Sequence, residues 1–131
     1  MKRVMVFGTF DTLHEGHLDF FKQAKVYGDY LIVVVARDHN VERVKGRKPD
    51  LSEDQRFVAI KNLVIVDEVL LGGGSDPYEI IRNKKPEVIC LGYDQDAFTA
   101  NLSAKFPEIK IIRLKAYKPE IYKSSKLKVK K

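Results

Sequence analysis

Five short apolar runs recur along the chain, and longer stretches with a more mixed pattern separate them. Three of the runs are nearly unbroken and rich in valine and isoleucine, which is typical of strands that helices cover on both faces of a parallel sheet. The intervals are long enough for crossover helices between successive strands. The pattern therefore predicts strands at residues 4–7, 31–36, 64–71, 88–91 and 109–114.

Helical patterns fill the intervals between these runs. Residues 16–26 place Leu18, Phe21 and Ala24 near one face of a helix. Ser52 is followed by acidic residues and fits the N-cap of the next helix. Further helices are predicted to open at Asp76-Pro77 and end before Pro86, to span residues 97–105, and to open at Ser124-Ser125 near the C-terminus.

The alternation of strands and helices predicts a single α/β domain over residues 1–131. We expect a Rossmann-like, doubly wound sheet of about five parallel strands. Ligands of such sheets bind beyond the carboxyl ends of the strands, where the strand order reverses. The loops that follow residues 7, 36, 71, 91 and 114 are therefore the places to look for a site.

The composition is that of an ordinary soluble protein, with 44% hydrophobic and 32% charged residues. No run approaches the roughly 20 apolar residues of a membrane span, and the first apolar run is too short for a signal peptide. Cys90 is the only cysteine, so no internal disulfide can form, and its apolar neighbours predict a buried side chain. We expect a cytoplasmic protein that does not bind a membrane.

The net charge of +6 is concentrated at one end of the chain. Residues 113–131 carry eight basic residues and one acidic residue, so this segment has a charge of +7 and the remainder a charge of −1. Such a segment could meet a phosphate-rich ligand or nucleic acid, or it could be a solvated tail. Charge alone favours the tail.

The loop after the first run carries the strongest chemical signal, Gly-Thr-Phe-Asp-Thr-Leu-His-Glu-Gly-His from Gly8 to His17. A helix that begins near Gly16 offers free N–H groups to an anion, and His14 and His17 could then face one phosphate group. The pair could also bind a metal, but zinc needs at least a third ligand and His39 is the only other histidine. Neither the dinucleotide fingerprint nor a Walker A loop is present.

This loop resembles the signature of the cytidylyltransferase-like nucleotidyltransferases, and the resemblance covers nearly the whole chain. It implies that His14 and His17 contact a nucleoside triphosphate and stabilise the pentacoordinate α-phosphorus during transfer to an acceptor phosphate. The resemblance implies nucleotide contacts for the rest of the motif as well, namely Thr9, Phe10, Glu15 and Gly16.

A basic segment, Arg-Val-Lys-Gly-Arg-Lys-Pro from Arg43 to Pro49, follows the second run. This segment could be a solvated cluster of charges. The resemblance instead implies a mobile loop that closes over the triphosphate, so that Lys45 or Lys48 reaches the phosphates, with Lys45 as a catalytic residue. Arg56 matches the family's arginine on the following helix and is expected to contact phosphate. The resemblance also implies a divalent cation such as Mg²⁺, held mainly by the triphosphate and water and not by protein ligands.

Two later segments bear on the substrate. Asp94 lies in Leu-Gly-Tyr-Asp-Gln after the fourth run and can accept hydrogen bonds from a base or ribose, although an ordinary turn would use the same residues. Tyr117 could stack on a base, and Ser124 and Ser125 could begin a helix that holds another phosphate. A frayed basic tail is the alternative for this last segment.

Two branches of the family differ at these segments. Glycerol-3-phosphate cytidylyltransferases typically show Gly-Asp-Asp-Trp where this chain has Gly-Tyr-Asp-Gln, and an Arg-Thr-Glu-Gly-Ile-Ser run that this chain lacks before Ser124. The segments Leu-Gly-Tyr-Asp-Gln and Lys-Ala-Tyr-Lys look more like the archaeal-type FAD synthases, which implies ATP and FMN as substrates. CTP with glycerol 3-phosphate is the alternative pair.

A non-catalytic nucleotide- or RNA-binding module is the rival from another functional class. The basic C-terminal segment with its tyrosines could bind RNA, but no RNA-binding motif is visible. We therefore expect no nucleic-acid partner. The sequence leaves the oligomeric state open, and a homodimer is among the alternatives.

Overall fold

A computed structural model of the chain describes residues 1–73, 76, 78–92 and 101–115. In these ranges five parallel strands form one sheet in the order β3-β2-β1-β4-β5. The strands are β1 (Arg3–Gly8), β2 (Tyr30–Val35), β3 (Glu68–Leu71), β4 (Val88–Leu91) and β5 (Lys110–Arg113). The predicted Rossmann-like parallel sheet is confirmed, and its strand order reverses between β1 and β4.

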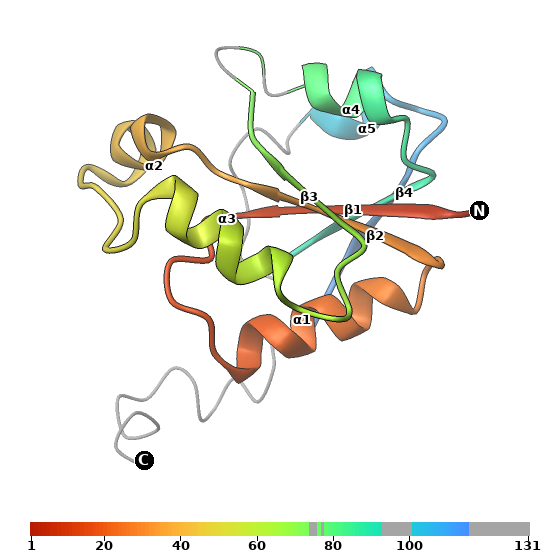
Figure 1. Cartoon of the computed structure of the whole chain (residues 1–131). Helices are drawn as coiled ribbons and strands as arrows, with labels where there is room; N and C mark the ends of the chain where they lie inside the picture. The colour runs from red at the N-terminus through yellow and green to blue at the C-terminus, as the bar shows by residue number, and fades with distance from the viewer. Residues whose placement is uncertain (74–75, 77, 93–100, 116–131) are drawn as a thin grey trace.

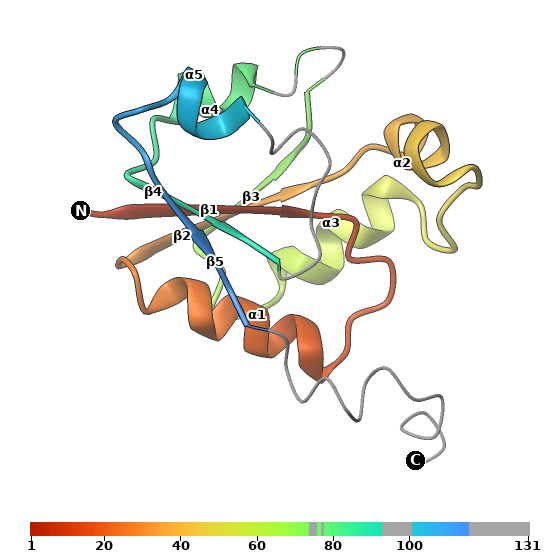
Figure 2. The ribbon, with the colours of Figure 1, turned by 180° about the vertical axis from the view of Figure 1, so that it is seen from behind.

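Helices cover both faces of the sheet, as Figures 1 and 2 show from opposite sides. Two helices lie on one face and two on the other, while the remaining helix sits beyond the carboxyl ends of β2 and β3. The helices are α1 (Glu15–Lys25) and α3 (Glu53–Lys61) on the first face, α4 (Glu79–Lys84) and α5 (Leu102–Lys105) on the second, and α2 (Asp38–Lys45) at the edge.

The alternation of side chains along β1 builds two separate cores. Val4 and Val6 pack with α1 and α3 in one cluster, and Met5 and Phe7 pack with α4 and α5 in the other. Cys90 belongs to the first cluster, and burial raises the pKa of its thiol to about 12. The central strands are thus apolar on both faces because both faces are covered.

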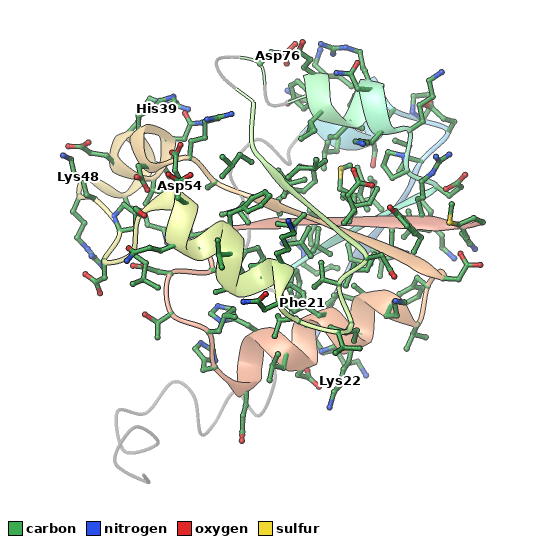
Figure 3. All side chains as sticks on the ribbon, viewed as in Figure 1. Phe21, Lys22, His39, Lys48, Asp54 and Asp76 are labelled. Carbon is green, nitrogen blue, oxygen red and sulfur yellow. The ribbon has the colours of Figure 1, made fainter. Side chains whose placement is uncertain are left out.

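The helix starts follow local chemistry. Ser52 is the N-cap of α3, as predicted, and forms a capping box with Gln55: each side-chain oxygen accepts the other residue's backbone N–H. On α1, Phe21 and Ala24 are buried as predicted, but Leu18 is 36% exposed. Figure 3 shows Phe21 turned toward the sheet and its neighbour Lys22 turned away from it.

Two predicted boundaries were wrong, and one helix was not predicted. The strand expected from residue 64 begins only at Glu68, because Val64 is 99% exposed in a turn and Val66 donates its backbone N–H to the Leu63 carbonyl. Helix α4 begins at Glu79, two residues after Pro77. The helix α2 was not expected, since Val41 is its only buried residue and one position gives no helical period. Residues 97–100 of another predicted helix lie outside the described residues.

The structure shows no helix in its described ranges that is long and apolar enough to cross a bilayer.

Candidate active site

The loop from β1 to α1 leaves the sheet at the point where the strand order reverses. Both views in Figures 1 and 2 place it at the same edge of the sheet as α2, beyond the carboxyl ends of the strands. This is the position at which open α/β sheets bind their ligands.

Two histidines form the start of α1. His14 is the N-cap, and its Nδ1 accepts the backbone N–H of Gly16 at 2.9 Å. The Nδ1 of His17 accepts the backbone N–H of His14 at 3.3 Å, so the two residues complete a capping box with imidazoles in both positions. The rings are stacked with 4.0 Å between their centroids. The structure therefore brings the predicted histidine pair together.

These contacts determine the protonation of both rings. A ring nitrogen that accepts a hydrogen bond from an amide carries no proton, so both neutral rings carry their proton on Nε2. Burial lowers the pKa of His14, and burial together with the neighbouring His14 lowers the pKa of His17 to about 4. Near pH 7 the pair is therefore neutral and offers N–H donors, not imidazolium charges, to an anion.

Two glycines make room for this arrangement. A Cβ on Gly16 would lie 2.7 Å from Cε1 of His14, so any larger residue would displace the capping ring. A Cβ on Gly8 would lie 2.6 Å from the ring of Phe10. Gly16 thus leaves space for the His14 ring, whereas Gly8 leaves space for the Phe10 ring.

The Phe10 side chain belongs to the core and not to the surface of the loop. Its ring is buried, with 6% exposure, and packs edge-on against His17 at 5.5 Å between centroids. Its φ of 54° is in the left-handed region, which a bulky residue rarely adopts. The side chain is therefore part of the core, and only the backbone of Phe10 can serve as a ligand contact.

Asp11 ties this loop to the segment before α3. Its Oδ1 accepts the N–H of Leu51 and its Oδ2 the N–H of Asp50, both at 2.8 Å. Burial alone would raise the pKa of Asp11, but these amides and the positive charges of Arg56 and Arg47 hold it below the ordinary value. The carboxylate thus stays ionised and holds the two loops together.

The predicted basic loop is in part a helix. Arg43 and Lys45 lie in the last turn of α2, and Gly46 ends that helix with a φ of 82°, which its missing side chain allows. Lys48 follows in the irregular segment, and Figure 3 shows it at the outer edge of this region, away from the core. In the described part of the chain, the side chains of Lys45, Arg47 and Lys48 form no ion pair. Their charges are therefore available to a bound anion.

Arg56 does not have the surface position that a direct phosphate contact needs. Its side chain is completely buried, and its guanidinium donates to the carbonyls of Leu51, Thr9 and Ala36 and to the carboxylate of Asp38. The expectation of a phosphate contact is thus not met in this structure. The guanidinium instead connects the ends of β1 and β2 with α2 and α3.

Sequence reasoning missed the acidic partners of this network. Asp38 accepts from Arg56 at 2.6 Å, and its own backbone N–H donates to Glu53 at 2.8 Å. Glu53 also pairs with Arg37, whose Nε donates to the carbonyl of Gly72 after β3. The available signal for Asp38 was its position shortly after a buried strand. That signal was overlooked because nothing near Asp38 in the sequence indicates Arg56 as its partner.

Only some of the remaining residues that were predicted to contact the substrate lie within the described part of the chain. Thr9 and Glu15 lie in the loop and in the first turn of α1, as expected. After β4, the carbonyl of Gly92 accepts from Arg113 at 2.8 Å, which places an unpredicted arginine at this edge. Asp94, Tyr117, Ser124 and Ser125 lie outside the described residues. Within the described ranges no group of three side chains could hold a metal ion.

A model of the cytidylyltransferase-like family matches residues 5–129. The chain is 41% identical over 121 residues to a FAD synthase of Aciduliprofundum boonei, covering 89% of this chain and 80% of that protein. It is 42% identical over 131 residues to a FAD synthase of Thermococcus sibiricus, covering 95% of this chain and 88% of that protein. The crystal structure of a Thermoplasma volcanium protein named for lipopolysaccharide core biosynthesis matches with a TM-score of 0.83 and 40% identity, covering 89% of this chain and 98% of that chain.

Proposed function

The chain belongs to the cytidylyltransferase-like family, and from this premise we propose that it transfers the adenylyl group of ATP to FMN, giving FAD and pyrophosphate. The observation that carries the reaction class is the stacked pair His14 and His17 at the start of α1, where the strand order reverses. The choice of ATP and FMN is supported by the FAD synthases that match over most of the chain.

The reaction makes limited demands on the protein. An oxygen of the FMN phosphate forms a bond to the α-phosphorus, while the bond between that phosphorus and the bridging oxygen breaks and pyrophosphate leaves. The attacking phosphate is already an anion, so no strong base is required. Catalysis then depends on positioning and on stabilising negative charge as it develops.

The residues of the site fit these two tasks. The Nε2–H groups of His14 and His17 are proposed to donate to oxygens of the triphosphate around the α-phosphorus. Because both rings are neutral, they donate hydrogen bonds to the triphosphate without adding positive charge. The cations of Lys45 and Lys48 are proposed to offset the charge of the leaving pyrophosphate, since no described acidic side chain pairs with them.

A divalent cation such as Mg²⁺ fits this site as part of the substrate. The described residues hold no group of three possible metal ligands, and both carboxylate oxygens of Asp11 accept backbone amides. The cation would therefore be held mainly by phosphate oxygens and water. It would supply further neutralisation of the triphosphate.

Four assignments outside the described residues stay proposals. Asp94 is proposed to bind the base or ribose, Tyr117 to stack on the nucleotide, and Ser124 and Ser125 to contact phosphate. We propose that the protein acts in the cytoplasm. A homodimer stays a prediction, which light scattering on the purified chain would test.

The test of the acceptor and the nucleotide is a panel of reactions with the purified chain and Mg²⁺. ATP and CTP are each combined with FMN or glycerol 3-phosphate, and the products are separated by chromatography. The proposal expects FAD from ATP and FMN alone. CDP-glycerol from CTP and glycerol 3-phosphate, with no FAD, would show the reaction class to be right and the substrates wrong. No product from any pair would instead favour a binding module.

A further inference from the structure

Arg56 is the only charged side chain that is completely buried among the residues the structure describes. Burial of an arginine is costly unless its donors are matched, and an apolar side chain would fill the same space at lower cost. Here the guanidinium forms four hydrogen bonds, and three of them go to backbone carbonyls of Thr9, Ala36 and Leu51. The charge is thus used to orient backbone, which an apolar residue could not do.

Two of these carbonyls belong to the loops that begin at the carboxyl edge of the sheet. A single nitrogen, Nη1, donates to the oxygen of Thr9 at 2.9 Å and to the oxygen of Ala36 at 2.7 Å. The peptide bonds that follow are trans and planar, so each N–H points opposite to its carbonyl. The N–H groups of Phe10 and Arg37 therefore point away from Arg56.

Neither of these two N–H groups has a hydrogen-bond acceptor within the described residues. Native proteins rarely leave such groups unpaired away from water, because an unmet donor costs free energy. Both lie at the edge where the histidine pair and the basic end of α2 also lie. An anion at this edge would give both donors an acceptor.

The conformation of Phe10 shows why a residue from outside the loop must fix the loop backbone. Its φ of 54° is strained for a bulky residue, and rotation of the peptide between Thr9 and Phe10 would change that angle. The rotation is opposed at one end by the bond from Arg56 to Thr9 and at the other by burial of the Phe10 ring beside Gly8. Loss of Arg56 would leave only the ring to hold the peptide.

We propose that Arg56 is a positioning residue for triphosphate binding, which fixes the peptides after Thr9 and Ala36 so that the N–H groups of Phe10 and Arg37 donate to the triphosphate. Asp38 supports it by accepting from Nη2 at 2.6 Å. This inference rests on the proposed function, because it takes a nucleoside triphosphate as the ligand. It assigns Arg56 an action through backbone amides and no contact with the substrate.

The variants are Arg56→Met, which keeps an unbranched apolar stem and removes every donor, and Arg56→Lys, which keeps the charge and some donors. The matched control is Ile60→Val, since Ile60 is equally buried and lies one turn further along α3. Each variant is characterised by its melting temperature, by calorimetric affinity for ATP with Mg²⁺, and by steady-state kinetics in which ATP and FMN are varied separately.

We expect Arg56→Met to lower kcat/KM for ATP about 100-fold, as misplacement of a positioned group can do. The KM for FMN should change less than about twofold, and Arg56→Lys should recover part of the loss, because its ammonium can still donate to carbonyls. Ile60→Val should lose thermal stability with unchanged ATP affinity. A folded Arg56→Met protein that binds ATP like the control would overturn the proposal.

Three further outcomes also decide the proposal. If Arg56→Met does not fold, Arg56→Lys and Asp38→Asn carry the test, and wild-type ATP affinity in both overturns the proposal. If the wild-type protein binds ATP but makes no FAD, the acceptor assignment fails and the ATP affinities still decide the role of Arg56. Absence of ATP binding by the wild-type protein would overturn both.

Discussion

The imidazole rings of His14 and His17 stack at the first turn of α1 with an angle of 27° between their planes. Each Nδ1 accepts a backbone N–H of that turn, so the same two side chains cap the helix and present their Nε2–H groups as donors. The structure thereby couples the start of the helix to the chemistry of the site.

Replacing His17 separates catalysis from folding. His17→Ala should lower kcat about 10²–10³-fold, by comparison with other donors that stabilise developing charge. The variant should stay folded, because the ring touches the first core only at Phe10 and belongs to neither core cluster. Turnover and melting curves of the same preparation check this, and a folded variant with near-normal turnover would contradict the assigned role.

His14→Asn tests the two tasks of the other histidine. Asparagine is among the best N-cap residues, so the variant should keep most of the stability, whereas His14→Ala should lose about 1 kcal/mol of unfolding free energy. Both variants lose the Nε2–H donor and should lose similar activity. Urea unfolding beside turnover distinguishes the two tasks, and full activity of His14→Asn would mean that His14 is only a cap.

Gly16→Ala should act through His14. The added methyl group would lie 2.7 Å from the His14 ring, so the ring must move and the cap is disturbed. We expect activity to fall about tenfold or more, since misplaced catalytic groups are costly. Combined with His14→Asn, the glycine change should cost little further activity, because neighbours that share one contact are not additive. Independent, additive losses in this double-mutant cycle would refute the link.

The lowered pKa of His17 predicts a specific pH dependence. The folded protein holds this ring neutral down to about pH 4, whereas an unfolded histidine protonates near pH 6.5. As the pH falls below 6.5 the unfolded chain binds a proton that the folded chain does not, so folding stability is lost progressively between pH 6.5 and about pH 4.

The measurement compares the wild-type protein with His17→Asn by urea unfolding at pH 7.5 and pH 5. Asp11 and His14, whose pKa values are also lowered, are present in both proteins, so the difference reports the removal of the His17 ring. The wild-type protein should lose more stability between these two pH values than His17→Asn does. Equal losses of stability in the two proteins would mean that the His17 ring titrates freely.

Neutralising the basic segment should weaken triphosphate binding more than FMN binding. The triple variant Lys45→Ala, Arg47→Ala, Lys48→Ala removes three exposed cations that have no described ion-pair partner. The affinity for ATP should fall and become less sensitive to salt, because fewer charges contribute. Calorimetry at two salt concentrations checks both effects.

The matched control removes the same charge far from this edge, in the exposed lysines Lys2, Lys22 and Lys61. If both triple variants bind ATP equally well, the segment from α2 is only a solvated surface and takes no part in binding.

The sheet could be predicted because its strands are short valine- and isoleucine-rich runs, and burial on both faces leaves such runs unbroken. The cap at Ser52 and the start of α1 could be predicted because a capping signal is local. The start of β3 could not, since Ile65 and Val66 are partly buried against the core from a turn and mimic a strand in the sequence.

The buried role of Arg56 was beyond the reach of the sequence for another reason. Its partners Thr9 and Ala36 are 47 and 20 residues away along the chain, and they offer backbone atoms that carry no sequence signal. The inward turn of Phe10 likewise depends on a left-handed backbone that is unusual for its residue type. Asp94, Tyr117, Ser124 and Ser125 stay predictions, since they lie outside the described residues.

The central claim, adenylyl transfer at the loop between β1 and α1, is tested most directly by following a labelled phosphate. The purified chain is incubated with FMN, Mg²⁺ and ATP labelled either at the α- or at the γ-phosphate, with the His17→Ala variant in parallel. The account predicts that the α-label appears in FAD and the γ-label in pyrophosphate, and that both products fall strongly in the variant. Release of the γ-label as free phosphate, or equal FAD formation by wild type and variant, would contradict it.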